Sequence, residues 1–424
     1  MRFLFPALAV VLAVSALPVG AQTPQGSAPL TLAEAMRLAE AASPILRARE
    51  AQFAAVEGAR REAASLFFNN PALSTEGTRR RFSPPDGRAT EWTVGIAQAI
   101  ETGGQQARRR EAASAALDAL RAEVEDARRQ ARAEAALRFH AVLAAQRRVQ
   151  IEQRSVDLFD NTAQAVAKRR AAGQDTRLDA NVALIEAERA RNAVASAREQ
   201  LLDARSDLGS VLQLPPSTLP EVVGELSLPT NDAPAYALDQ LQTSALDLPK
   251  LRALAGREAA ARGRLGVERA SRYPDVTVGL NVGREGLSGA REQVTTLSVS
   301  VPLPLFKRND AAIGQALSEV GQAEIERTVA VRDTQAQVRR WSRLESQRER
   351  VLRSQRTMAS ASADNQQLAA RSRQAGQIGL LDQLLVNRQA LDAERELNDA
   401  LAEYHATRIE LEQAAGWSQE GFPR

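Results

Sequence analysis

The sequence predicts a mainly α-helical fold with a small transmembrane β part, built as a tandem repeat. Two long stretches, 105–208 and 322–415, contain no proline and consist mostly of good helix formers. The residues around Gly173 match those around Gly376 at an offset of 203 positions, which indicates an internal duplication. Before each helical stretch, apolar and small polar residues alternate, which is typical of strands. Each repeat therefore supplies one β-hairpin and one long helical hairpin.

The composition is that of a helical protein with thin packing. Of the 424 residues, 44% are hydrophobic but only 4% are aromatic. The 55 basic and 52 acidic residues are interspersed, so they are expected to form solvated helix faces. No basic block stands apart, and nucleic-acid binding is not expected. Cysteine is absent, which excludes disulfides and a lipidated N-terminal cysteine.

The N-terminus is predicted to be a secretory signal peptide, residues 1–21. Arg2 precedes an apolar run from Phe3 to Leu17, and small residues precede Gln22. The run is short for a transmembrane helix of about 20 residues. We expect the mature chain to begin at Gln22, and no later stretch is apolar enough to span a membrane as a helix.

The first repeat, 22–223, is expected to open with short helices. Thr31 is placed to cap a helix, with Glu34 as its capping-box partner. Ser43-Pro44 ends that helix and starts a second one, because proline is tolerated in a first turn. The second helix is predicted to continue to about Phe67.

A β-hairpin is expected at about 71–101 and again, in the second repeat 235–424, at about 274–304. Strands of about ten residues are long enough to cross a bilayer when tilted. The apolar face is predicted to contact lipid and the small polar face to line a lumen. Expected on the lipid face are Val278, Leu280, Val299 and Val301, and on the lumen face Thr277, Gly279, Ser298 and Ser300. The alternative is a soluble hairpin with one face on a core.

The helical hairpins are predicted at about 103–213 and 307–416, with a linker at 224–234 between the repeats. At roughly 1.5 Å per residue, the first arm would reach about 100 Å. Gly173 and Gly376 allow the reversals, because a positive φ costs glycine little. Asp175-Thr176 is placed to cap the returning helix. The Gly103-Gly104 pair before the first arm is expected to be a sharp strand-to-helix exit and not a phosphate-binding loop.

Four strands cannot close a barrel, and an open sheet edge in lipid leaves backbone groups unpaired. Several copies must therefore pool their strands. Two chains would supply eight strands and three chains twelve.

The chain resembles the family of TolC-like outer-membrane efflux proteins. Within this family it is most similar to the cation-efflux (CzcC-like) branch. The resemblance rests on residues 30–35, 70–74 and 301–309 and on the two tips, 170–179 and 373–382. It implies a homotrimer in the outer membrane of a Gram-negative bacterium. Its twelve-stranded β-barrel would contact outer-membrane lipid and continue as an α-helical barrel through the periplasm.

The resemblance also implies a function, a passive exit duct for metal cations or drugs in a tripartite efflux system. The implied partners are a periplasmic adaptor (membrane fusion) protein and an inner-membrane pump of the RND type. The alternative is a structural periplasmic coiled-coil protein without channel activity. A periplasmic adaptor is disfavoured, because adaptors carry one helical hairpin and this chain carries two.

Enzymatic chemistry is not expected, and neither is a cofactor or a metal site. No HExxH pattern, phosphate loop or nucleophile elbow is present. His140 and His405, the only histidines, stand alone on separate helices and are not related by the repeat offset. They are expected to be solvated or packed.

The candidate functional residues lie at the two hairpin tips. The predicted adaptor-docking residues are Arg170, Gly173, Gln174, Arg373, Gly376 and Gln377. By resemblance, Asp179 and Asp382 match aspartates at the periplasmic gate. A ring of six carboxylates from three chains would have raised pKa values and attract cations. Alternatively, both are ordinary first-turn acids stabilised by the helix N-terminus.

Overall fold

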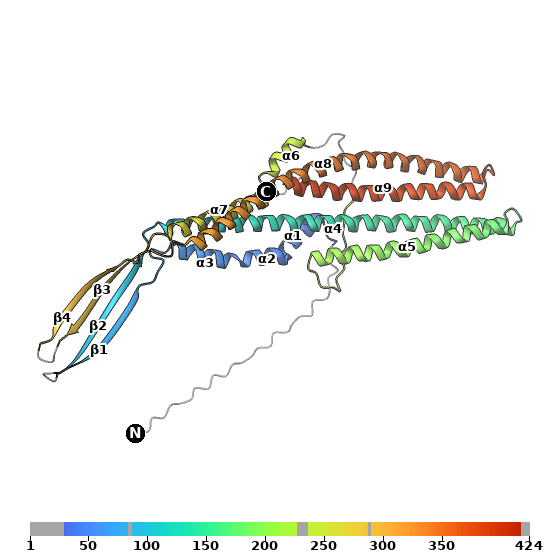
Figure 1. The fold of residues 1–424 in the computed structure, drawn as a ribbon. Coiled ribbons are helices and arrows are strands. Elements are labelled where there is room, and N and C mark those ends of the chain that lie inside the picture. The colour runs from blue at the N-terminus through green and yellow to red at the C-terminus, as the bar shows by residue number, and fades with distance from the viewer. Residues whose placement is uncertain (1–28, 84–86, 227–235, 287–289, 417–424) are drawn as a thin grey trace, which may run out of the picture.

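A computed structural model describes residues 29–83, 87–226, 236–286 and 290–416. The molecule is elongated, with a sheet at one end and long helices along the rest (Figure 1). The predicted signal peptide, most of the predicted linker and the tail after Gly416 lie outside the described residues. None of the described helices is both long and apolar enough to cross a membrane.

The first half of the chain supplies short helices, a β-hairpin and a long helical hairpin. Its elements are α1 (Leu32–Ala42), α2 (Pro44–Ala51), α3 (Phe53–Ala64), β1 (Ala72–Phe82), β2 (Gly87–Ile100), α4 (Gln105–Ala171) and α5 (Arg177–Val211). Helix α4 has 67 residues, so its length is about 100 Å, as expected.

The second half repeats this order, with two helices before its β-hairpin in place of three. Its elements are α6 (Leu238–Ala245), α7 (Pro249–Ala270), β3 (Val276–Glu285), β4 (Glu292–Ser300), α8 (Asp310–Gln374) and α9 (Leu380–Ala415). Val301, predicted on the lipid face, lies one residue beyond the end of β4.

Side-chain caps define where the first helices begin. Thr31 Oγ1 accepts a hydrogen bond from the Glu34 backbone N–H (3.4 Å), and the Glu34 carboxylate accepts one from the Thr31 N–H (3.2 Å). The predicted capping box is therefore present, and the hydrogen bonds from Thr31 lower the pKa of Glu34. Ser43 caps α2, since its Oγ accepts from the Leu46 N–H at 3.3 Å.

The helix predicted to run from Pro44 to about Phe67 is in fact divided. It breaks at Gln52, whose backbone N–H donates to the Arg49 carbonyl three residues earlier (3.1 Å). The second part ends at Ala64, because the Ser65 hydroxyl turns back to a carbonyl of the last turn (2.7 Å). Both short helices, α2 and α3, can consequently lie along α4.

The four strands form one antiparallel sheet in the order β1-β2-β3-β4. Leu280 lies opposite Ile96 and Leu297, whereas Gly279 lies opposite Ala97 and Ser298. Directly opposed residues share a face of the sheet. The predicted alternation is therefore present, with one apolar face and one small, polar face. Within the described residues, β1 and β4 are edge strands that each pair on one side only.

The small, polar face is closely packed between neighbouring strands. A Cβ atom at Gly95 would lie 1.7 Å from Asn281 Oδ1, and one at Gly279 would lie 2.6 Å from Ser298 Oγ. Glycine is therefore needed at these positions for the facing polar side chains to fit.

Helices α4 and α8 extend from the sheet end to the far end of the molecule, and α5 and α9 return from there about half of the way (Figure 1). Helix α4 contacts α9, and nearer the sheet α7 contacts both α4 and α8. The α4–α7 contact is backbone against backbone. A Cβ at Gly256 would lie 2.9 Å from Ala119 Cα, and one at Gly263 would lie 2.7 Å from Ala112 Cβ. We call this contact the glycine seam.

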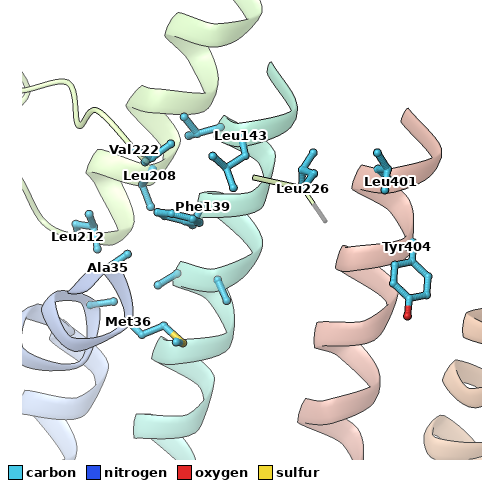
Figure 2. Close-up of a cluster of buried hydrophobic side chains, with 14 of the residues drawn as sticks. Ala35, Met36, Phe139, Leu143, Leu208, Leu212, Val222, Leu226, Leu401 and Tyr404 are labelled. Carbon is cyan, nitrogen blue, oxygen red and sulfur yellow. The ribbon is translucent and has the colours of Figure 1, made fainter. Parts of the chain in front are cut away.

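A hydrophobic cluster midway along the molecule joins the two halves (Figure 2). It includes Phe139 of α4, Leu208 of α5 and Leu401 of α9. The start of the described chain is tied to it, because Leu30 forms a parallel bridge with Val222, a buried member of the cluster. Burial of this apolar surface fixes the first repeat against the last helix.

Candidate functional site at the helical tips

The two helical hairpins reverse through the same turn. Gly173 and Gly376 have φ values of 76° and 74°, in the left-handed region that favours glycine. The N–H groups of Gln174 and Gln377 each donate to a carbonyl of the preceding helix's last turn, at 2.9 Å. This is a Schellman ending, which satisfies carbonyls that would otherwise lack partners. The predicted reversal points are confirmed.

The two predicted gate aspartates are helix-capping groups in the single chain. Asp179 Oδ2 accepts from the Thr176 N–H (3.0 Å) and hydroxyl (2.6 Å), and Asp382 Oδ2 accepts from the Gly379 N–H (3.1 Å). The hydrogen bonds from Thr176 lower the pKa of Asp179, with a smaller contribution from the positive charge of Arg373. The first-turn role considered as the alternative is therefore present. A raised pKa in a carboxylate ring would need the neighbouring chains.

Asp175 connects the two tips, a role that sequence reasoning missed. Its carboxylate is nearly buried, with 5% of the side chain exposed, and lies 3.1 Å from Arg373 Nη2 and 3.2 Å from Arg169 Nε. Arg373 also donates to the carbonyl of Ile378 in its own tip. The position equivalent to Asp175 in the second repeat is Ile378, so the acid occurs in one tip only. This difference between two otherwise matching tips is the sequence signal from which a special role of Asp175 could have been predicted.

Five of the six predicted docking residues are exposed: Arg170, Gly173, Gln174, Gly376 and Gln377. The sixth, Arg373, is half-buried by its ion pair with Asp175. Two leucines at equivalent positions, Leu178 and Leu381, are 70% and 64% exposed beside the tips. Each tip therefore presents polar groups and one exposed leucine.

Two buried carboxylates bind the repeats together between the tips and the middle of the molecule. Glu152 of α4 accepts from Arg395 of α9 and from Arg148 of its own helix, both to Oε1, at 2.8 and 2.7 Å. Nearer the tips, Glu186 of α5 pairs with Arg388 of α9 and with Arg189. Such pairs are costly to break, because a single partner remains as an uncompensated buried charge.

The two histidines, each alone on its own helix, pack against each other. The rings of His140 and His405 stack with their centroids 5.0 Å apart and their planes 19° apart. His140 Nδ1 also lies 2.8 Å from the Ala136 carbonyl oxygen. Their helices, α4 and α9, are adjacent in space although distant in sequence, so no sequence spacing could reveal the pair. Among the residues that the structure describes, no group of three or more potential ligands could hold a metal ion.

Comparison with known proteins relates both halves of the chain to one family. The model of the family described as "Outer membrane efflux protein" matches residues 35–212 and 241–417. The cobalt-zinc-cadmium resistance protein CzcC of Cupriavidus metallidurans is 30% identical over 305 residues, which are 71% of this chain and 69% of that protein.

Solved structures with a similar fold include the outer-membrane channel OprN, with a TM-score of 0.76 and 20% identity over 91% of this chain and 90% of that one. CusC has a TM-score of 0.75 and 17% identity over 91% and 92% of the two chains. The CmeC outer-membrane channel of Campylobacter jejuni has a TM-score of 0.74 and 13% identity, over 97% of this chain and 94% of that one. The members of this family and the proteins in these structures are channel proteins and not enzymes.

Proposed function

Because the chain belongs to the outer membrane efflux protein family, we propose that it is the outer-membrane channel component of a tripartite efflux system. It is a passive exit duct, to which an inner-membrane pump of the RND type delivers substrate through a periplasmic adaptor. The sheet lies in the outer membrane of a Gram-negative bacterium, and the long helices extend into the periplasm.

The observation that carries the proposal is the pair of edge strands. β1 and β4 each leave one row of backbone groups without a strand partner in the described chain. The apolar face of the same sheet exposes Leu73, Leu297 and Val299. An apolar sheet with open edges is unfavourable in lipid unless the edges close. Pairing β1 of one copy with β4 of the next closes them, and three copies give twelve strands around one lumen.

The proposed substrates are divalent metal cations. The support is the 30% identity to a protein named for cobalt, zinc and cadmium resistance. A duct does not need a high-affinity metal site, because tight binding would slow release.

The tips are the proposed contact with the adaptor and the proposed gate. The exposed groups at Arg170, Gly173 and Gln174, with their second-repeat counterparts Gly376 and Gln377, would dock the adaptor. The Asp175–Arg373 ion pair would hold the two tips of one chain together in the resting state. In a trimer, Asp179 and Asp382 would supply six carboxylates at the closed end, which would favour cation entry and could hold a divalent ion.

The proposal is tested first in cells and then in a planar bilayer. Deleting the gene should reduce growth on cobalt, zinc or cadmium more than growth on drugs. The purified mature chain should require detergent, migrate as a trimer and conduct when inserted. Replacing both gate residues, Asp179→Ala with Asp382→Ala, should reduce cation selectivity and weaken block by divalent cations added on the periplasmic side.

Clear outcomes would contradict each part. A monomer that is soluble without detergent would support the structural coiled-coil alternative and remove the duct. Unchanged selectivity and block in the double variant would leave the duct but assign both aspartates to helix capping alone. If the deletion reduced growth on drugs but not on metals, the proposed substrates would be drugs and not metal cations.

A further inference from the structure

The charged residues of the sheet are separated between its two faces. Strand register puts Arg79, Arg81, Arg88 and Arg284 on the apolar face: Arg81 is opposite Arg88, and Arg284 is opposite Trp92. The carboxylates of the strands, Glu76, Glu91, Glu285 and Glu292, all fall on the small, polar face. We call the four arginines the arginine band.

The arginine band lies at the end of the sheet remote from the helices. Moving along the apolar face from the helices, Leu280 is paired with Ile96 and, two residues further, Val282 with Val94. The next pair is Trp92 with Arg284, and the remaining arginines follow toward the hairpin ends. This order matches a membrane. The apolar rows suit the hydrocarbon, the tryptophan suits the membrane interface, and the arginines suit the level of the lipid headgroups.

The band carries charge that the described chain does not neutralise. All four side chains are exposed, and within the described residues none of them forms an ion pair with a carboxylate. Arg80, which points to the other face, behaves differently, because it pairs with the buried Glu91 at 3.2 Å. An arginine of β1 therefore forms an ion pair when a carboxylate lies on the same face of the sheet.

Closure with neighbouring copies would not neutralise the band either. If β1 of one copy paired with β4 of the next, the residues beside Arg79 and Arg81 would come from the apolar face of β4. That face of β4 carries Gln293, Thr295, Leu297 and Val299, with no acid among them. Among the described strand residues no carboxylate faces the band, so its charge is available to a ligand from outside the assembly.

We propose that the arginine band binds the phosphate groups of the outer-leaflet lipid surface, lipid A in particular, and so anchors the rim of the duct to its lipid. The inference rests on the proposed function, since it requires the sheet to be in the outer membrane. Guanidinium groups bind phosphate oxygens in bidentate fashion, and Arg suits this role better than Lys. The adjacent apolar rows would pack the acyl chains of the same lipid molecules.

The test compares two lipids that differ only in phosphate. Full-length mature protein is placed in phosphatidylcholine nanodiscs with diphosphoryl lipid A or its dephosphorylated form, and bound lipid is measured by native mass spectrometry. The wild-type protein should enrich the diphosphoryl form. Arg79→Gln, Arg81→Gln and Arg284→Gln together should lower that enrichment, by about fivefold per arginine, an effect that salt should reduce.

Two control variants separate charge position from charge number. The triple replacement of the same residues by Lys should retain more of the enrichment than the Gln variant does, because the charge remains at the rim, but less than the wild type, because the bidentate contact is lost. Arg339→Gln, Arg343→Gln and Arg356→Gln remove three exposed arginines from α8 and should leave the enrichment unchanged. An equal loss in the α8 variant would overturn the inference.

Insertion into plain phosphatidylcholine distinguishes this inference from the proposed function. A protein that inserts and conducts there, yet binds both forms of lipid A equally, overturns the arginine band and leaves the duct. Failure to insert into any bilayer overturns both. A glutamine variant that inserts normally but loses lipid A enrichment supports the inference without a folding defect.

Discussion

At the scale of single residues, Glu152 is the buried charge on which the α4–α9 contact most depends. Its side chain is 2% exposed, and both carboxylate oxygens are occupied by arginine donors. Burial alone would raise its pKa, but the hydrogen bonds from Arg395 and Arg148 outweigh burial and hold the pKa below the ordinary value of 4.5. The group is therefore ionised at neutral pH and stabilises the folded state there.

Replacing this residue should destabilise the protein measurably. Glu152→Gln leaves two arginines without their carboxylate and should cost about 3 kcal/mol. Because the folded pKa is lower than the unfolded one, the stabilisation is complete above about pH 4.5 and is lost as the pH falls through the folded pKa. Thermal unfolding in detergent, followed by circular dichroism over this pH range, measures both effects.

A surface pair supplies the matched control for Glu152. Glu188 is half exposed and pairs with Arg191 three residues later on the same helix. Glu188→Gln should change stability by less than about 1 kcal/mol. Equal losses for the two variants, or a Glu152 effect that grows as the pH falls, would contradict the assigned role.

At the scale of helices, the glycine seam predicts opposite signs for the same substitution. Gly263→Ala places a methyl group 2.7 Å from Ala112 Cβ and against its backbone, so the α4–α7 contact must separate. A loss of about 1–3 kcal/mol is expected for such overpacking. At Gly314 of α8 nothing lies within 4 Å of an added Cβ, so Gly314→Ala should raise stability by about 0.5–1 kcal/mol.

Unfolding of the two alanine variants under one set of conditions checks the prediction. A gain in stability for Gly263→Ala would show that α7 can move away from α4 without cost. A loss for Gly314→Ala would indicate a neighbour on α8 that the single chain does not contain.

Sequence patterns predicted the elements well where one local signal decides the structure. The alternation around Val278 and Ile96 predicted the strands, and the glycines at 173 and 376 predicted the reversals. The break at Gln52 was missed, because no proline or glycine marks it. The break depends on hydrogen bonds in the last turn of α2 and on the packing of both short helices against α4.

The candidate site was predictable only within each tip. The glycines of the two reversals and the capping aspartates follow from local turn and helix-start chemistry. The Asp175–Arg373 and His140–His405 contacts join residues that are distant in sequence. They depend on how one repeat is placed against the other, which no helical periodicity specifies.

At the scale of the whole molecule, the assignment of the two sheet faces can be tested on the proposed channel. Val299→Arg puts a charge on the apolar face and should cost about 2–4 kcal/mol near the bilayer midplane. Ser298→Arg lies on the other, small and polar face, which is predicted to line the lumen, so it should cost far less. Trimer yield after outer-membrane extraction compares the two, and equal damage would mean that the faces are wrongly assigned.

The glycine seam also has a geometric consequence for a closed tube. The circumference of such a tube is the sum of the distances between neighbouring helix axes around it. In an assembly of three copies, shortening one axis-to-axis distance per chain by about 1 Å removes roughly 3 Å of circumference and narrows the diameter by about 1 Å. Through Gly256 and Gly263, which let α7 approach α4 backbone to backbone, the sequence would thus set the bore of such a tube in the part next to the sheet.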